Sequence, residues 1–362
     1  MKKALIGGLI GVCLAGAAAA QDAPAPTVRP SSPNIRDLQI RGRVQAQAAF
    51  VSAKNDDVTR DWSTFEVRRV RMGLRGTLFQ NVRAQLEATL VPGSSLSMRS
   101  AFIEWREHAP AYVMLGFDKP RFGHEENTSS AAILTVERSM LTGTFAPGPM
   151  TGLAVNGNVE LLSYGLGVYT DRANANPANE GANYLFNGSV VLTLDPLVGQ
   201  TLRLRADVLH SADEGGNFGG RFETAVAGSL HFAAGPFDLR AEYIHGEDRN
   251  SDSTGGFYIM PSFYITPQIQ AVARYERMTS DRATGVRAAS RYARRVPGLE
   301  TPEEGPDPTR GDLGQALYLG GSYYLAGNNQ KLMLGVELAE IQNTSAGALQ
   351  SATVLGAWRM LF

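Results

Sequence analysis

Arginine recurs at even spacing through the first quarter of the sequence, while lysine is scarce throughout. Only five of the 34 basic residues are lysines. A guanidinium group is always charged and presents a planar fork of hydrogen-bond donors, so a row of arginines is suited to binding phosphate, carboxylate and other anions. Side chains two residues apart share one face of an extended strand. The arginines that follow this spacing are Arg41, Arg43, Arg69, Arg71, Arg75 and Arg83.

The five histidines form no recognised catalytic or metal-binding motif. None has the HExxH spacing of a zinc protease or lies in a nucleophile elbow. His124, Glu125 and Glu126 are adjacent, so their side chains point in different directions and are poorly placed to share a metal ion. His231 has Ser229 as a neighbouring hydroxyl, without any motif around the pair. The sequence therefore predicts no catalytic residue, no metal site and no cofactor, and an enzyme built into the fold is kept as an alternative.

Residues 1–20 have the features of a secretory signal peptide. Two lysines are followed by a short apolar run and by small residues, with an Ala-x-Ala cleavage sequence that ends at Ala20. The single cysteine, Cys13, lies within this segment, so the mature chain has no disulfide or thiol chemistry. Residues 21–34 are rich in proline and are predicted to be a disordered lead-in. One domain is expected over residues 35–362.

From residue 35 onward, apolar and polar residues alternate with a period of two, the pattern of β-strands with two different faces. The segments 39–50, 67–79 and 81–90 show it most clearly, and similar segments continue to the C-terminus. Each apolar face is sustained over about ten residues, the length that a tilted strand needs to cross a membrane. No run of ~20 apolar residues follows the first twenty, so no transmembrane helix is expected.

The connections between these strands alternate between long and short. Turns of two or three residues, such as Gln80-Asn81, join most strands at one end, where the connections 106–111 and 195–200 are slightly longer. The connections at the other end are 51–64, 118–150, 170–182, 211–220, 246–254, 279–313 and 340–350, with 91–95 as a short exception. This asymmetry is typical of outer-membrane barrels. The sequence thus predicts an all-β fold, a closed transmembrane antiparallel β-barrel of about 16 strands in the outer membrane of a Gram-negative bacterium.

If the apolar face meets lipid, the polar face of each strand lines the interior. The first three predicted strands then bring six arginines and one acid, Glu87, to the inner wall. Neighbouring strands lie ~4.8 Å apart, so the guanidinium groups would form one positive strip that concentrates anions. In the alternative interpretation, arginines of the lumen pair with its acids, such as Arg205 with Asp207, and stiffen the wall.

The connection 118–150 is unusually long and partly apolar. Phe122, Ile133, Leu134 and Val136 are poorly suited to a loop in water, and folding back into the barrel would cover them. The sequence therefore predicts an inward-folded constriction loop that brings further charges to the arginine strip. The basic residues of this loop are Lys119, Arg121 and Arg138.

At this loop the sequence resembles the phosphate-selective porins O and P. The matching motifs are Gly116-Phe-Asp-Lys119-Pro120, Phe122, Glu125, Thr128-Ser129-Ser130 and Glu137-Arg138-Ser139, with Arg68-Arg-Val-Arg71 before them and Arg274-Tyr275 and Gly320-Gly-Ser-Tyr-Tyr324 after them. The resemblance covers nearly the whole mature chain and implies a sixteen-stranded porin, assembled as a homotrimer, whose constriction is lined by arginines. Lys119, Arg121 and Arg138 lie in the matching loop. Arg69, Arg71 and Arg75 lie in the matching strand.

The expected function is a water-filled, anion-preferring porin for passive diffusion of small solutes such as phosphate. The expected partners are small anionic solutes, outer-membrane lipid and copies of the same chain, while a net charge of −1 gives no basic excess for nucleic acid. Phosphate-specific members of the family carry lysine clusters, whereas Lys54, Lys119 and Lys331 alone remain after signal cleavage. Arginines of the 279–313 connection could take their place, and a general anion preference is the safer expectation. A closed structural or adhesive barrel is the main alternative.

Overall fold

The computed structural model describes residues 27–28, 34–55, 58–90, 96–107, 110–170, 184–212, 222–299, 307–344 and 347–362. The predicted signal peptide, residues 1–20, lies outside these ranges. Within the predicted lead-in, Thr27–Val28 form a short strand, β1, which pairs with Gln39 and Leu38. The first long strand begins at Ile35.

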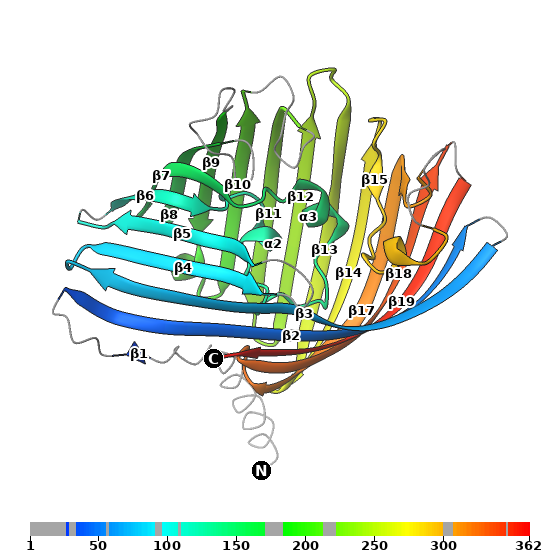
Figure 1. The fold of residues 1–362 in the computed structure, drawn as a ribbon, viewed down its shortest axis with the longest axis horizontal. Helices are drawn as coiled ribbons and strands as arrows, with labels where there is room; N and C mark the ends of the chain where they lie inside the picture. Colours follow the sequence, from blue (N-terminus) through cyan, green and yellow to red (C-terminus); the bar gives the residue numbers. More distant parts are fainter. Residues whose placement is uncertain are drawn as a thin grey trace, which may run out of the picture.

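The fold is a single closed sheet, because each long strand pairs antiparallel with the next and the last one, β19, pairs with the first, β2 (Figure 1). Closure satisfies the backbone hydrogen bonds and leaves no strand edge in lipid. The strands of the barrel are β2 (Ile35–Asn55), β3 (Val58–Leu78), β4 (Val82–Leu90), β5 (Ser97–Trp105), β6 (Ala111–Asp118), β7 (Met150–Val159), β8 (Leu162–Thr170), β9 (Tyr184–Thr193), β10 (Thr201–Ser211), β11 (Thr224–Ala234), β12 (Phe237–Glu247), β13 (Ser253–Thr266), β14 (Ile269–Ser280), β17 (Leu313–Ala326), β18 (Gln330–Asn343) and β19 (Gly347–Leu361). The prediction of a sixteen-stranded antiparallel barrel is confirmed.

The remaining elements are short and lie in the connections between strands. They are α2 (His124–Asn127), α3 (Met140–Phe145), α4 (Asp195–Val198), β15 (Val286–Arg287), η1 (Ala293–Arg295) and β16 (Arg310–Gly311). Within the described ranges, no helix has the length and apolar character needed to cross a membrane.

The two faces of the strands differ as the alternation predicts. Outward side chains such as Phe50, Leu166 and Leu334 are 62%, 64% and 65% exposed in the isolated chain. Ala49 and Val51, which flank Phe50 in the sequence, point inward and are buried. An apolar outer belt with a polar interior is the arrangement of a barrel surrounded by lipid.

The hairpin of β2 and β3 corrects the prediction of a long connection at 51–64. Both strands have 21 residues, and β2 ends at Asn55 while β3 begins at Val58. Ser52 lies opposite Asp61, so the ladder continues through the polar segment. Polar outward side chains are tolerated where a strand rises above the lipid, and for this reason polarity alone does not mark the end of a strand.

Two β-bulges change which side chains face the interior. The register shifts at Arg68 in β3 and at Arg99 in β5, and each is an extra residue in its ladder. A bulge re-aims the side chains on either side of it. As a result Arg68 points inward together with Arg69, and Arg99 reaches the inner loop at Glu126. Strict alternation would have placed Arg68 and Arg99 against lipid.

Candidate functional site

Residues 119–149, here called the inner loop, contain α2 and α3 and lie inside the ring of strands (Figure 1). The loop contacts strands on different sides of the barrel. Gly123 donates its N–H to Asp207 of β10 at 2.9 Å, and Arg359 of β19 donates to the Val136 carbonyl at 2.6 Å. The apolar side chains of the loop are buried as expected: Phe122, Ile133, Leu134 and Val136. The loop therefore crosses the lumen and does not extend into solvent.

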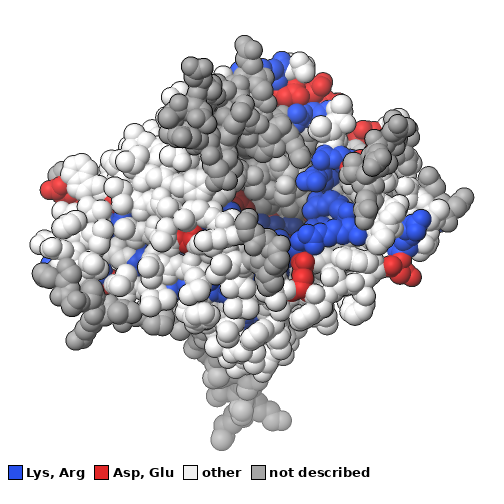
Figure 2. All heavy atoms as spheres, viewed as in Figure 1, with Lys and Arg blue, Asp and Glu red and all other residues white. Residues whose placement is uncertain are grey.

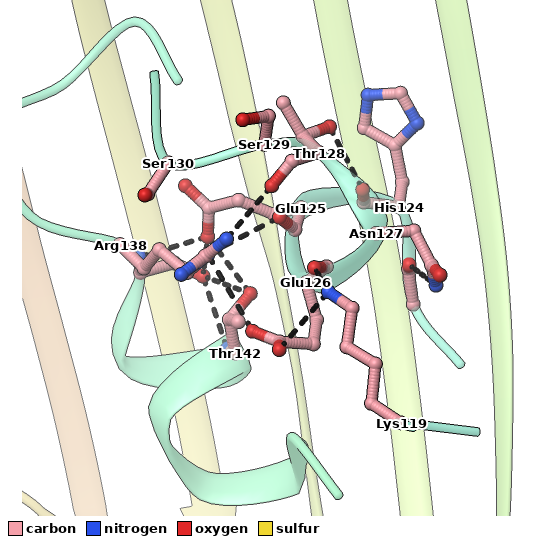
Figure 3. A network of polar contacts seen from close by, with 12 residues as sticks. Lys119, His124, Glu125, Glu126, Asn127, Thr128, Ser129, Ser130, Arg138 and Thr142 are labelled. Carbon is pink, nitrogen blue, oxygen red and sulfur yellow. Dashed lines mark hydrogen bonds and ion pairs between the residues drawn. The ribbon is translucent and has the colours of Figure 1, made fainter. Parts of the chain in front are cut away.

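Three basic groups surround the carboxylate of Glu126 on α2, two of which, Lys119 and Arg138, are visible in Figure 3. Its Oε1 lies 3.2 Å from Lys119 Nζ and 3.4 Å from Arg99 Nη2, and its Oε2 lies 3.5 Å from Arg138 Nε. Burial raises the pKa of a carboxyl group, but these cations hold the pKa of Glu126 below its usual range. The group is therefore ionised at neutral pH, and it compensates one of three positive charges.

Arg43 of β2 and Arg71 of β3 lie directly opposite each other in the ladder. Arg43 donates to the hydroxyl oxygens of Ser129 at 3.1 Å and of Ser130 at 2.5 Å, which carry no charge. Arg71 lies 3.6 Å from Glu87. The pair thus keeps an excess of positive charge on the inner wall.

Arg99 and Arg138 complete this group, because Arg43 and Arg71 both interact electrostatically with each of them. We refer to Arg43, Arg71, Arg99 and Arg138 as the arginine cluster. Among the described residues, the acids that form ion pairs with it are Glu87 and Glu126. Four guanidinium groups and the neighbouring Lys119 therefore meet two carboxylates, and the cluster keeps a net positive charge.

Sequence reasoning missed Arg99, because strict alternation from Ala101, Ile103 and Trp105 places it on the lipid face. The signal that could have found it is the consecutive polar pair Arg99-Ser100 inside an otherwise alternating strand. Arg68-Arg69 is the same signal in β3. Two adjacent polar residues within a membrane strand are consistent with either a bulge or the end of the strand.

Arg75 and Arg83 lie apart from the arginine cluster, nearer to the end of the barrel that carries the short turns. With Arg106 they line a polar cavity of about 460 Å³ near the turn between β3 and β4. Glu104 lies 3.4 Å from Arg83 and 2.6 Å from Arg106, and so compensates part of their charge. These residues extend the basic surface toward the end of the barrel that carries the short turns.

Three other predicted residues also lie elsewhere in the lumen. Arg69 is buried and donates to Gln45 Oε1 at 2.9 Å. Arg121 donates to the Tyr112 hydroxyl at 2.7 Å. Arg41 is exposed on the inner face of β2, where its partner across the ladder is Gly73 of β3. Of the predicted site residues, the structure brings together Arg43, Arg71, Arg138 and Lys119.

On β10 and β12, lumen arginines pair with acids. Arg205 lies 2.6 Å from Asp207 on β10, and Arg240 lies 3.0 Å from Asp238 on β12. For these arginines the structure follows the alternative interpretation, in which ion pairs stiffen the wall.

Most acids on the far wall are hidden behind the inner loop. The buried Arg274 of β14 lies 3.5 Å from Glu125 and 3.3 Å from both Glu276 and Glu337. Glu242 of β12 is buried nearby, and the exposed fraction of each of these four glutamates is 2% or less. The inner loop thus covers Glu242, Glu276 and Glu337 of the wall β12–β18, so these carboxylates are not presented to the lumen.

The connection after β14 also folds toward the lumen. Arg291 lies 2.6 Å from Glu66 of β3 and 3.9 Å from Glu137 of the inner loop. Burial, followed by the charges of Arg287 and Arg291, lowers the pKa of Arg294 to about 10. Figure 2 shows Lys and Arg side chains gathered around a hollow on this side of the barrel. This connection therefore adds a second set of basic residues, Arg287, Arg291 and Arg294, to the interior.

The adjacent side chains of His124, Glu125 and Glu126 diverge (Figure 3). The His124 ring faces His231, with ring centroids 5.8 Å apart. Burial, followed by the charges of Arg240 and His231, lowers the pKa of His124 to about 3, so the ring is neutral. In the part of the chain that the structure describes, no group of three or more His, Cys, Asp or Glu side chains is placed to hold a metal ion.

A closed barrel with an apolar outer belt, a charged interior and a loop crossing the lumen is the architecture of an outer-membrane porin. The chain belongs to the phosphate-selective porin O and P family, whose sequence profile matches residues 38–294. This finding confirms the resemblance seen in the motifs of the inner loop. Both family and fold are those of a membrane channel. A comparison with curated proteins finds no match.

Solved porin structures share this fold at low sequence identity. The anion-selective porin from Comamonas acidovorans has a TM-score of 0.63 at 13% identity, over 90% of this chain and 99% of its own. The outer membrane channel DcaP of Acinetobacter baumannii has a TM-score of 0.61 at 12% identity, over 93% of this chain and 100% of its own. A loop L8 deletion mutant of OmpT from Vibrio cholerae has a TM-score of 0.58 at 11% identity, over 91% of this chain and 100% of its own.

Proposed function

We propose that this porin conducts small anions in preference to cations, phosphate among them. The observation that carries the proposal is the arginine cluster, in which Arg43 and Arg71 are neighbours across the ladder and the described acids compensate part of the charge. Fixed positive charge between low-dielectric walls concentrates anions and repels cations. The anion-selective porin of similar fold supports the same direction of preference.

The inner loop supports a path along β2–β6. The loop is anchored to β10, β14 and β19, and Arg43 of β2, Arg68 of β3 and Arg99 of β5 also contact it. We place the narrow part of the passage where the loop meets this wall, at the arginine cluster. An anion that leaves the cluster then meets Arg75, Arg83 and Arg106. Successive sites that each bind weakly favour entry without trapping the ion.

A general anion preference fits the residues better than an exclusive one for phosphate. Lys331 is buried and donates to the Ile133 carbonyl of the inner loop, and Lys54 lies on the outward face of β2. These lysines therefore do not line the proposed path. Arginines supply the positive charge, and their planar forks suit phosphate and carboxylate alike.

We also propose the steps that bring the protein to its place of action. Residues 1–20 direct export and are removed before Gln21, and lipid surrounds the apolar belt. Three copies assemble in the membrane, in line with the family and with the trimer form of Vibrio cholerae OmpT, which has a TM-score of 0.50 at 12% identity, over 90% of this chain and 99% of its own.

Recordings of the purified, folded protein in planar bilayers test the function. Under a salt gradient the reversal potential reports the ratio of anion to cation permeability, and it is measured with chloride, phosphate and pyrophosphate. We expect stable conductance steps with an anion-biased reversal potential, reduced in the variant Arg43→Ala/Arg71→Ala. Folded protein without conductance steps would favour the closed structural or adhesive barrel. Steps without anion preference would contradict the role given to the cluster.

A further inference from the structure

The first turn of α2 is held by a carboxylate from the far wall of the barrel. Glu242 of β12 accepts the backbone N–H of His124 with Oε1 and that of Glu125 with Oε2, the latter at 3.3 Å. Gly123, one residue earlier, donates to Asp207 at 2.9 Å. Negative charge is favourable at the free N–H groups that begin a helix. Glu242 therefore fixes this end of α2 against β12.

The opposite end of α2 holds Arg138 of the arginine cluster (Figure 3). Arg138 donates from Nε to the Glu125 carbonyl at 3.2 Å and from Nη2 to the Thr128 carbonyl at 2.7 Å, and its Nε lies 3.5 Å from Glu126 Oε2. All three acceptors belong to α2 or to its C-cap. A displacement of α2 would therefore move Arg138 relative to the rest of the cluster.

We propose that Glu242 is a positioning residue that sets the anion preference of the pore by holding α2, and with it Arg138, in place; this inference rests on the proposed anion-preferring function. Glu242 is 2% exposed and lies behind the inner loop, so it acts through the loop and not on the solute. Both of its oxygens accept backbone N–H groups. A glutamine would turn its own N–H groups toward one of these donors, and an aspartate is shorter by one methylene group.

The sign of the effect separates positioning from simple charge. If Glu242 acted only as a negative charge in the lumen, Glu242→Gln would raise the anion preference. If Glu242 positions Arg138, the same substitution lowers it. Glu337 provides the matched control, since it is a buried glutamate 3.3 Å from Arg274 that accepts no N–H of the inner loop among the described residues.

Salt-gradient reversal potentials in planar bilayers with potassium chloride test the proposal. The variants are Glu242→Gln, Glu242→Asp, Glu337→Gln, Arg138→Ala and the double variant Arg138→Ala/Glu242→Gln, each checked for a folded barrel by its heat-modifiable migration on a gel. We expect both Glu242 variants to lower the ratio of chloride to potassium permeability by about twofold or more. Glu337→Gln should leave the ratio unchanged or raise it. Glu242→Asp keeps the charge, so a fall in this variant reports a change in geometry.

The double variant ties the effect to Arg138. Once Arg138 is replaced, α2 no longer holds a cluster arginine through its backbone carbonyls, and Glu242→Gln should produce a much smaller further fall than it does in the wild type. If Arg138→Ala lowers the ratio but neither Glu242 variant does, the inference is overturned and the proposed function stands. If the wild-type channel has no anion preference, the proposed function fails and the inference fails with it. If the wild type prefers anions but Arg138→Ala leaves the ratio unchanged, the inference fails and the proposed function stands.

Discussion

Arg43 and Arg71 are direct cross-strand partners on the inner wall, although like charges opposite each other destabilise a sheet. Arg43 donates to the uncharged hydroxyls of Ser129 and Ser130, and Arg71 lies 3.6 Å from Glu87, the carboxylate that attracts both guanidinium groups. The barrel therefore keeps an unfavourable pair at the place where the inner loop approaches the wall. Local rules of stability are broken in this way at functional sites, where the chemistry of the site determines the residue.

Arg69 and Arg71 share the inner face of β3, but their effects on selectivity are expected to differ. Arg71 belongs to the arginine cluster, whereas Arg69 is buried and donates to Gln45. Arg71→Ala should lower the ratio of anion to cation permeability by about twofold. Arg69→Ala should change the ratio little and lower the temperature of unfolding, because Gln45 Oε1 loses its donor in a buried place. Reversal potentials and heat-modifiable gel migration measure the two effects, and equal losses of selectivity would contradict the assignment.

Arg99 reaches the lumen through a β-bulge, and we expect its removal to weaken anion preference as well. Arg99→Ala removes one of the three cations around Glu126, so the negative charge of this carboxylate is less compensated and repels anions more strongly. Arg203 is a suitable control, because it is exposed and pairs with Asp195 at 2.7 Å beside a short turn. Arg203→Ala should leave the reversal potential unchanged. If Arg99→Ala also left the reversal potential unchanged, Arg99 would lie outside the conducting path.

The barrel could be predicted from the sequence because lipid imposes a period of two on each strand and allows no open edge. The same rule could not locate the bulges. A single extra residue shifts every later side chain to the other face, and the adjacent polar pairs Arg68-Arg69 and Arg99-Ser100 resemble the end of a strand. Polar residues in the β2–β3 hairpin led to the opposite error, a connection placed where the ladder continues.

The sequence predicted most of the residues of the candidate site, but not how they lie relative to one another. Alternation shows which face a residue occupies but not its height or its neighbours. One predicted strip therefore divides into Arg43 and Arg71 in the cluster, Arg75 and Arg83 near the short turns, and the buried Arg69. The path of the inner loop depends on contacts with strands far away in the sequence, such as those of Glu242 and Arg274, which no local spacing encodes.

Ser129 offers a way to neutralise Arg43 without removing it. Its Oγ accepts from Arg43 Nη2 at 3.1 Å. Ser129→Asp would place a carboxylate beside this guanidinium group and should lower the ratio of anion to cation permeability by about twofold or more. In Ser129→Asn the new side chain has nearly the size of aspartate but no charge, so the permeability ratio should stay close to that of the wild type. The effect of aspartate should also shrink at high ionic strength, because salt screens the added charge. Equal effects of both variants would indicate a change in loop shape.

Glu137 links the inner loop to β3, and its titration predicts how this link depends on pH. Arg68 Nε lies 2.8 Å from Glu137 Oε1. Burial raises the pKa of Glu137, but the charges of Arg68 and Arg69 outweigh burial and lower it to about 2, from an ordinary value of 4.5. A carboxyl group whose pKa is lowered by folding stabilises the protein above its unfolded pKa. This stabilisation is lost as the pH falls toward the folded value.

Glu137→Gln should therefore lower the temperature of unfolding by a constant amount above about pH 5, and the difference from the wild type should shrink below about pH 4. The reason is that the unfolded chain takes up a proton at this carboxyl group below its ordinary pKa of 4.5, whereas the folded protein keeps the group ionised until the pH approaches about 2. Unfolding temperatures of both proteins across this range, read from gel migration, measure the difference. Glu247, whose side chain is 60% exposed, gives a control substitution to glutamine that should have little effect at any pH. A difference that increased on acidification would show that Glu137 is not held in its ionised form.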